Sequence, residues 1–569
     1  MIVTTKDTMR ESVAARVADE MYQGALPYAD SGLTVTNQYT RYPYLIASNH
    51  KILIQLPSSA PFRTVALQFL PVFPVKTGFA APFWPFFAGR GFARRASLLV
   101  YDETIRTSRE WFRGEGWQMA KVSRKGSDAA TRKAAMVKHA LDKTISAIVE
   151  NPAEFVVNPG KDFTRKRTLP LGRMLHIILG MGGNSLQKEI SDYFEGSKEF
   201  ATKSAFVQQR SKIKPEALKY MLHQFNNACH DSKTYMGYHL YACDGTKVTV
   251  ATGLDNADTH VRGGSNSDGF NQYHISAFYD LMNKTYMDAI VKGVNSTDEP
   301  QAAVDMINSL DFPEKSILIC DRGYAAMNLM EHCNRKEGLD YLIRVKESWI
   351  LEVKALPMKE LDTDIHIELR TTQTNEDKIA YRNRTAKYIP GKSKFGKIKS
   401  SQCWDFESPH RMTIRIVRFR ITEDRYETIA TSLDRFAFPA ERIKELYNMR
   451  WGIETSFRDL KYAIGMVNFH ARKENSILQE IYASLVMYNF SERMTSCAVV
   501  VQAGGCKHTY RVNFAMSAYS CKKFFWERIA TAILLLDEIL RYVEPVREGR
   551  SDKRKMKTQS AVNFIYRVA

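Results

Sequence analysis

The feature that most constrains the fold is a short, mainly apolar run that ends directly at an acid. Ser316–Cys320 reads SILIC, which predicts a strand buried on both faces because the run is too short for a helix. Asp321 follows it, and Gly323 then frees the backbone. Ligand sites in open α/β sheets lie at the carboxyl ends of strands, so Asp321 is a candidate site residue. Capping the next helix is the alternative role for this aspartate.

A second acid follows another apolar run. Tyr238–Cys243 predicts a strand, Asp244-Gly245 a hairpin turn, and Lys247–Thr252 a second strand. Asp-Gly is a strong hairpin signal, and by itself it carries no chemistry. We also expect a helix at about residues 299–310 and further strands at residues 274–283, 284–293 and 340–346.

Charged side chains follow helical spacing later in the chain. Residues 447–461 read YNMRWGIETSFRDLK. At about 100° per residue, four polar groups fall on one narrow helical stripe: Tyr447, Arg450, Glu454 and Lys461. One carboxylate among two cations and a phenol suggests a site that binds a metal through the acid and phosphates through the rest. The alternative is a solvated helix face with ion pairs.

The acids Asp244, Asp321 and Glu454 are therefore candidates for one site. Two aspartates at strand ends and a glutamate on a helix can converge to hold a pair of divalent cations. Two metals about 4 Å apart activate the attacking oxygen and stabilise the leaving oxygen in phosphodiester chemistry. Hard oxygen ligands select Mg²⁺, with Mn²⁺ as a substitute, over softer metals.

These residues carry a resemblance to a known family. The chain resembles bacterial insertion-sequence transposases of the Asp-Asp-Glu (DDE) class, specifically the group with a Tyr-x2-Arg-x3-Glu-x6-Lys (YREK) signature, which residues 447–461 match without a gap. The family's first aspartate, in a strand followed by Asp-Gly, matches Asp244 in ACDGT, and its second matches Asp321 in CDRGY. The resemblance covers residues 136–567, whereas residues 1–135 match nothing in the family pattern.

The resemblance implies both a fold and an activity. The implied fold is α/β, a ribonuclease-H-like catalytic core interrupted by a β-rich insertion, with a helical N-terminal region and a helical C-terminal region. The implied activity is cut-and-paste DNA transposition. In this reaction, Mg²⁺-dependent cleavage at the transposon ends is followed by attack of the freed 3′-hydroxyl on target DNA. Members of the group can pass through a hairpin at the element's end, which the sequence does not reveal.

The family's pattern also implies a role for each matching residue. The three acids are implied to be catalytic metal ligands, and the other signature residues to contact DNA phosphates: Tyr447, Arg450 and Lys461. An arginine can fork onto phosphate oxygens, while a lysine acts as a point charge. Trp451 is a candidate for stacking on an unpaired base, and a core tryptophan is the alternative.

The implied partners are the terminal inverted repeats of the transposon, the target DNA and, for synapsis of two ends, a second copy of the chain. Two rival functions stay open. One is a non-transposing nuclease on the same fold, which would cut DNA without joining it. The other is a catalytically inactive DNA-binding protein derived from a transposase, against which the intact set of acids counts.

Changes in composition and in the spacing of apolar residues along the chain predict six regions. We interpret residues 1–135, which are rich in proline and aromatic residues, as an upstream extension or a poorly ordered appendage, with the functional protein beginning near Met136. The other regions are a helical, putatively DNA-end-binding segment at 136–232, the first part of the core at 233–346, a β-rich insertion at 347–437, the second part of the core at 438–497, and a helical region with a basic tail at 498–569.

Within residues 160–230, several short helices carry the basic residues Lys203, Arg210, Lys212 and Lys214. These helices could form a helix-turn-helix DNA reader or a plain helical bundle, and the pattern does not decide between them. The basic tail from Arg541 to Ala569 suits a phosphate backbone, although such runs are usually solvated and flexible.

Composition agrees with a nucleic-acid partner. Lys and Arg outnumber Asp and Glu by 81 to 62, a net charge of +19, which points to a polyanion. The eight cysteines are scattered without a CxxC pair, so neither a zinc site nor a disulfide framework is indicated, and a reduced cytoplasm fits best. The resemblance implies that this cytoplasm is bacterial and that the protein associates with the nucleoid. The richest apolar window, residues 65–89, contains Lys76 and four prolines and is a poor membrane span.

Overall fold

The computed structural model describes residues 127–546, with the exception of residues 230–232, 252–256, 263–268, 372–373, 384–385, 390–403, 424 and 503–507. Upstream of residue 127 it covers only the backbone of four short strands. The basic tail beyond residue 546, the basic stretch at 391–401 and the apolar window beyond residue 68 therefore lie outside the described residues. The chain divides into two units, Met1–Trp117 and Gln118–Ala569.

The N-terminal unit contains one small antiparallel sheet of order β1-β2-β3-β4. Its strands are β1 (Ile2–Thr4), β2 (Tyr44–Ser48), β3 (Lys51–Leu56) and β4 (Arg63–Gln68). The second unit opens with helix α3 (Ser127–Glu150), in which Ala134 is fully buried. The expected boundary at residues 135 and 136 therefore falls inside a helix.

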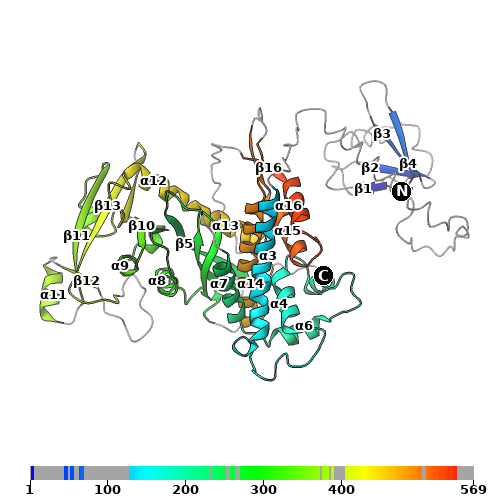
Figure 1. Ribbon diagram of the computed structural model, residues 1–569. Coiled ribbons are helices and arrows are strands. Elements are labelled where there is room, and N and C mark those ends of the chain that lie inside the picture. Colours follow the sequence, from blue (N-terminus) through cyan, green and yellow to red (C-terminus); the bar gives the residue numbers. More distant parts are fainter. Residues whose placement is uncertain are drawn as a thin grey trace, which may run out of the picture. The chain divides into compact units, whose positions relative to one another are not determined.

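A mixed sheet of ten strands forms the centre of the second unit (Figure 1). The strands that begin it are β5 (His239–Val250), β6 (His260–Val261), β7 (Phe270–Asp280), β8 (Thr285–Gly293), β9 (Ser316–Cys320) and β10 (Leu339–Val345). Strand β7 pairs antiparallel with both β5 and β8, whereas β9 runs parallel to both β5 and β10. The α/β class and the strand Ser316–Cys320 expected from the sequence are confirmed.

The Asp244-Gly245 pair does not form the expected hairpin turn. It lies in the middle of β5, where Asp244 pairs with Ala277 and Gly245 with Ser276 of β7. The ladder between β5 and β7 continues without a break from Tyr241 to Val250. Pairing along the whole of a long neighbouring strand therefore overrides the local turn preference of Asp-Gly.

The β-rich segment after residue 347 extends this sheet instead of forming a separate one. Strand β14 pairs antiparallel with β10, and β13, β11 and β12 follow in that order. The elements are α10 (Leu351–Lys354), β11 (Leu361–Thr371), α11 (Asn375–Arg382), β12 (Lys387–Ile389), β13 (His410–Thr422) and β14 (Arg425–Thr431). Figure 1 shows β11 and β13 at the end of the sheet far from the helical bundle.

Helices cover both faces of the central strands. On one face, α8 (Glu299–Ser309) and α9 (Met327–Arg335) pack against apolar residues such as Cys243 and Cys320, both fully buried. On the other face, α12 (Ala440–Met449) packs over Leu240 and Ile319. Both thiols are thus small core residues.

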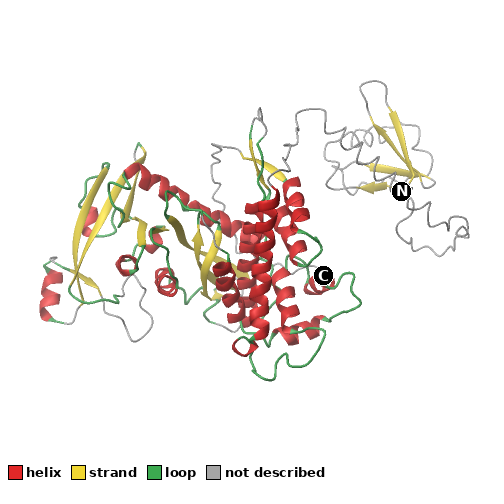
Figure 2. Cartoon of the chain, viewed as in Figure 1, coloured by secondary structure: helices red, strands yellow, loops and turns green. Residues whose placement is uncertain are grey.

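The remaining helices form a bundle around the long helix α14 (Glu474–Cys497), which Figure 2 shows as one block beside the sheet. Its members include α3, α4 (Leu171–Gly180), α5 (Leu186–Tyr193), α6 (Lys203–Arg210), α7 (Glu216–Ala228), α15 (Phe514–Phe525) and α16 (Ala532–Arg541). The strands β15 (Thr509–Val512) and β16 (Val543–Val546), which flank α15 and α16 in the sequence, pair antiparallel. Ser185 caps α5 by accepting a hydrogen bond from Lys188 N.

Arg210 of α6 is a core residue and not part of a basic, DNA-binding surface. It is 3% exposed, and its guanidinium donates to Gln479 Oε1 at 2.8 Å and to Glu480 Oε1 at 2.7 Å on α14. The packing of α3, α4 and α7 against α14 is that of a bundle. Of the two alternatives for residues 160–230, the structure favours the bundle.

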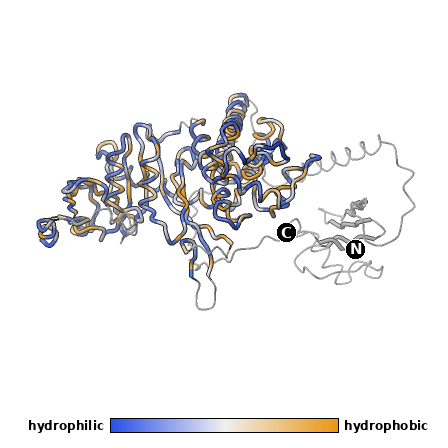
Figure 3. Tube along the Cα trace, turned by 90° about the horizontal axis from the view of Figure 1, so that it is seen from below, coloured by the Kyte–Doolittle hydropathy of each residue, from blue (hydrophilic) through white to orange (hydrophobic). Residues whose placement is uncertain are grey.

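Hydrophilic and hydrophobic residues alternate along the tube of the second unit in Figure 3. Among the described residues, no helix is both long enough and apolar enough to cross a membrane.

Candidate active site

Asp244 and Asp321 lie beside each other because their strands are neighbours. Strands β5 and β9 run parallel with Cys243 opposite Cys320, and each aspartate is the next residue of its strand. Asp321 also accepts a hydrogen bond from Gly323 N at 2.7 Å, so it caps the short turn that follows β9. The site role and the capping role that the sequence left open are therefore compatible.

The third acid, Glu454, comes from the helices that cover the face of the sheet opposite α8 and α9. Helix α12 begins after Pro439, as expected, and ends at Met449, and α13 (Trp451–Tyr462) continues directly after Arg450. Arg450 keeps helical backbone angles, φ −50° and ψ −34°. The expected helix over 447–461 is thus present, although its hydrogen bonding divides it into two segments.

Arg450 joins two of the acids. Its guanidinium lies 3.5 Å from Asp244 Oδ2 and 2.7 Å from Glu454 Oε1. The arginine side chain is 7% exposed, whereas that of Asp244 is 21% exposed and that of Glu454 is 31% exposed. The cation is therefore buried beneath two carboxylates that remain open to solvent.

The electrostatics of Asp244 reflect this crowding. Burial, together with the nearby Asp321 and Glu454, raises the pKa of Asp244 to about 6, against the lowering effects of the Gly245 N–H and Arg450. A neighbouring positive charge favours the ionised form of a carboxyl group, and neighbouring negative charges oppose it. One guanidinium does not balance three carboxyl groups, so the site retains excess negative charge when all three are ionised.

This charge balance and the oxygen-only donor set suit a hard divalent cation. Among the described residues, however, no three His, Cys, Asp or Glu side chains are drawn together closely enough to hold an ion as they stand. Arg450 lies between Asp244 and Glu454. The donor chemistry therefore fits a metal, and closing the acids around it requires the arginine to give up one contact.

The remaining signature residues differ in exposure. Tyr447 is 5% exposed and packs in the core, with the guanidinium of Arg450 5.8 Å from its ring centroid. Tyr447 and Arg450 are thus both buried, and their contact with DNA phosphates stays a prediction. Trp451 is 51% exposed, so the alternative of a core tryptophan is wrong. Lys461 is half-buried, and burial lowers the pKa of its ammonium group.

A pocket of about 300 Å³ lies at the carboxyl end of β10. It is lined by Arg322, which directly follows Asp321, and by a group from β10, β14 and the loop after β10: Arg344, Val345, Lys346, Glu347, Ser348, Tyr426, Glu427 and Thr428. The Nε of Arg344 lies 2.9 Å from Glu427 Oε1. The lining thus combines three cations, Arg322, Arg344 and Lys346, with two carboxylates, Glu347 and Glu427, a grouping that sequence spacing did not reveal.

Two further residues near the acids were also missed by sequence reasoning. Glu299 is the first residue of α8, and His274 lies in β7. Their side chains approach to 3.1 Å, and the imidazole lowers the pKa of Glu299. Neither residue lies in a recognisable motif, and only the pairing of β5 with β7 brings them to the site.

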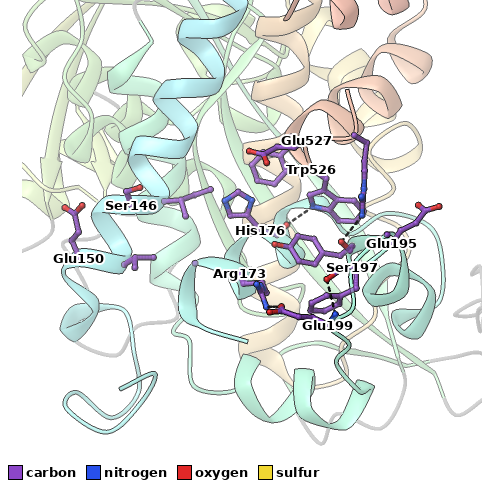
Figure 4. Close-up of a pocket in the computed structure, with 17 residues that line it drawn as sticks. Ser146, Glu150, Arg173, His176, Glu195, Ser197, Glu199, Trp526 and Glu527 are labelled. Carbon is purple, nitrogen blue, oxygen red and sulfur yellow. Dashed lines mark hydrogen bonds and ion pairs between the residues drawn. The ribbon is translucent and has the colours of Figure 1, made fainter. Parts of the chain in front are cut away.

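A larger pocket, of about 680 Å³, lies away from these acids in the helical bundle. Figure 4 shows His176 of α4 beside Trp526, which follows α15, and Arg173 of the same helix beside Glu199. The Nε1 of Trp526 donates to the carbonyl oxygen of His176 at 3.1 Å. None of the three acids lines this pocket.

Comparison with known proteins agrees with the chemistry of the acids. The family model "Transposase DDE domain" matches residues 236–490, which include all three. A curated relative, transposase InsG for insertion sequence element IS4 of Escherichia coli strain K12, is 20% identical over 343 residues, covering 57% of this chain and 70% of the relative.

Among solved structures, a piggyBac transposase synaptic complex with hairpin DNA covers 74% of this chain and 84% of that chain at 11% identity, with a TM-score of 0.36. This likeness is too weak to carry an argument. The family-model match and the curated relative together show that residues 236–490 are similar to the DDE domain of transposases.

Proposed function

We propose that the chain cuts DNA at transposon ends and transfers the freed strands into target DNA, with Mg²⁺ or Mn²⁺ as cofactor. The observation that carries this proposal is the assembly of Asp244, Asp321 and Glu454 from two neighbouring strands and one helix, with Arg450 in contact with two of them. We also assign the chain to the YREK group on the unbroken spacing from Tyr447 to Lys461.

A ribonuclease-H-like core is part of the same proposal. The central strand order β8-β7-β5-β9-β10, in which β5, β7 and β8 are antiparallel and β5, β9 and β10 are parallel, supports it. The acids lie where β9 ends beside β5, in keeping with the general position of sites at strand ends.

In this proposal the three acids hold the divalent ions, which would activate an attacking oxygen and stabilise the leaving oxygen of a phosphodiester. The protein's own contribution is to position these groups and balance their charge. Asp244 is fixed by a 2.8 Å hydrogen bond from Gly245 N, and Asp321 by that from Gly323 N. These hydrogen bonds orient the two aspartates, whereas Arg450 must release one of its two acids before an ion can be held between them.

DNA phosphates would be held by the cations around the acids. The pocket that contains Arg322, Arg344 and Lys346 is open to solvent, and Arg322 directly follows Asp321. Arginine binds phosphate oxygens through paired N–H groups, and lysine as a point charge. Trp451, exposed at the start of α13, is positioned to stack on an unpaired base.

The test is a cleavage and strand-transfer assay with DNA that carries the cognate inverted repeats. Asp321→Ala should abolish cleavage and leave DNA binding within about twofold of the wild type, because the lost carboxylate is a metal ligand and not a phosphate contact. Asp311→Ala, which removes an exposed aspartate upstream of β9, is the matched control and should cleave normally.

The possible outcomes separate the rival functions. Near-normal cleavage by Asp321→Ala would refute the assignment of the site. Cleavage without joining by the wild type would favour a non-transposing nuclease. Binding to the repeats without any cleavage would favour an inactive protein derived from a transposase.

A further inference from the structure

A fourth carboxylate approaches the acid site from the opposite face of the sheet. Glu299 begins α8 directly after Asp298, whose side chain caps the helix by accepting from Gln301 N. The Glu299 side chain is 36% exposed, and its Oε1 lies 3.1 Å from Nε2 of His274. His274 itself is 4% exposed. A buried imidazole therefore holds a carboxylate that solvent can still reach.

Two glycines make room for this pair. A Cβ on Gly245 would clash with the His274 ring and lie 2.7 Å from Glu299 Oε1. A Cβ on Gly323 would lie 3.0 Å from Asp321 Oδ1 and 3.7 Å from Glu299 Oε2. Glu299 and Asp321 therefore approach the same bare backbone position. Glycine in mid-strand often marks a close approach of other groups.

The sheet is open at this point, so groups from its two faces meet. Side chains of successive residues in a strand point to opposite faces, which places Asp244 on the side of α13 and the Gly245 position on the side of α8. Strand β9 pairs with β5 only as far as Cys243, so no strand covers that edge of β5 beyond it. Of these acids, Asp321 and Glu299 are the two that approach one common backbone position there, Gly323.

We infer that Glu299 is a fourth carboxylate of the divalent-metal site and that His274 is the residue that positions it. This inference rests on the proposed function. An additional hard oxygen donor would strengthen binding of Mg²⁺ or Mn²⁺ next to Asp321. Groups that border a metal site typically change its affinity by about 10- to 100-fold when they are removed.

A second observation points to a ligand at this position. The Nε2 atom of His274 is buried, and among the described residues it has no hydrogen-bond partner of good geometry, because Glu299 lies within reach but off line. Buried polar atoms in proteins are normally paired. A water molecule bound to an ion at this position would provide the missing partner. If the two side chains formed only a structural ion pair, we would expect His274 Nε2 to donate to Glu299 Oε1 in good geometry.

The experiment measures Mn²⁺ binding to the full-length protein, without DNA, by isothermal titration calorimetry. Glu299→Gln keeps the size of the side chain and removes its charge, and it should weaken Mn²⁺ binding by about tenfold or more. The Mn²⁺ concentration for half-maximal cleavage should rise by the same factor. Mn²⁺ binding within about twofold of the wild type would overturn the inference.

Asp305→Asn is the matched control, because it makes the same charge change at an exposed position of the same helix. It should leave Mn²⁺ binding unchanged. His274→Leu should weaken Mn²⁺ binding as Glu299→Gln does, and His274→Gln, which retains an N–H donor, should restore most of it. This second pair of variants decides the question if Glu299→Gln does not fold.

The failure of this inference can be told apart from failure of the proposed function. If Asp321→Ala is inactive while Glu299→Gln binds Mn²⁺ and cleaves like the wild type, only the role of Glu299 is refuted. If Asp321→Ala cleaves normally, the proposed function is refuted, and the inference with it.

Discussion

Replacing Asp244 by asparagine should stabilise the fold while it abolishes cleavage. The pKa of this carboxyl is raised from 3.8 to about 6. At about 1.4 kcal/mol for each pKa unit, its charge costs the folded state about 3 kcal/mol at neutral pH. Asparagine keeps the shape and can still accept from Gly245 N, but it loses the 3.5 Å contact with Arg450. The pKa shift already includes this contact, so we expect a net gain of about 3 kcal/mol in the free energy of unfolding at pH 8.

The gain should depend on pH in a defined direction. Because the folded-state pKa of Asp244 lies above the unfolded value, the folded protein binds the extra proton between about pH 4 and pH 6. Wild-type stability is therefore favoured by this group below pH 4 and loses that contribution as the pH rises through 6. The asparagine variant should match the wild type at pH 4 and exceed it at pH 8.

Thermal unfolding of Asp244→Asn and the wild type at both pH values measures this difference. Asp311→Asn, at an exposed position, is the control and should be neutral at each pH. Added Mn²⁺ should raise the wild-type midpoint more than that of the variant, since a ligand that binds only the folded state stabilises it. A variant that is less stable than the wild type at pH 8, or equally changed at pH 4 and pH 8, would refute the reasoning.

Two further predictions concern single cations. Lys461→Ala should weaken binding to a transposon end and make the slope of log affinity against log salt shallower by about one unit, and an unchanged slope would remove Lys461 from the phosphate contacts. Arg210→Ala should cost about 3–5 kcal/mol in thermal unfolding, because it leaves the buried Glu480 without its partner. Burial raises the pKa of Glu480, but Arg210 and His470 lower it further, to about 2. The ion pair of Arg210 with Glu480 therefore stabilises the wild type above about pH 4.5, and this stabilisation is lost as the pH falls towards 2. A loss below 1 kcal/mol for Arg210→Ala would contradict this account of the pair.

Much of the fold could be predicted from short-range pattern alone. The strand Ser316–Cys320 has no exposed face, so its composition was sufficient to define both ends. Helix α12 begins after Pro439 because proline suits a helix start and Glu441 suits the first turn. The strands at 364–372 and 411–421 were recognisable by their alternation, although nothing in them indicated that they extend the core sheet.

Features that depend on distant partners were not predictable. The four basic residues of 203–214 look alike in sequence, but Arg210 alone meets Gln479 and Glu480, more than two hundred residues away in the chain. Likewise, helical spacing placed Tyr447 and Arg450 on one stripe, but it could not show that this stripe faces the sheet and is buried. Periodicity identifies a face, and only tertiary packing decides what that face contacts.

The Asp244-Gly245 pair shows why a local signal can be strong and still lead to the wrong structure. In isolation the pair favours a tight turn, because both residues tolerate the required backbone angles. In this fold each residue serves a different need: Asp244 contributes a carboxylate towards Arg450, and Gly245 leaves space for His274 and Glu299. A turn here would break a ladder of ten paired residues between β5 and β7 and would separate Asp244 from Asp321. The site thus explains why an aspartate and a glycine occur here, whereas pairing in the sheet determines their backbone conformation. The Asp-Gly pair therefore indicates the chemistry of the site and does not indicate a turn.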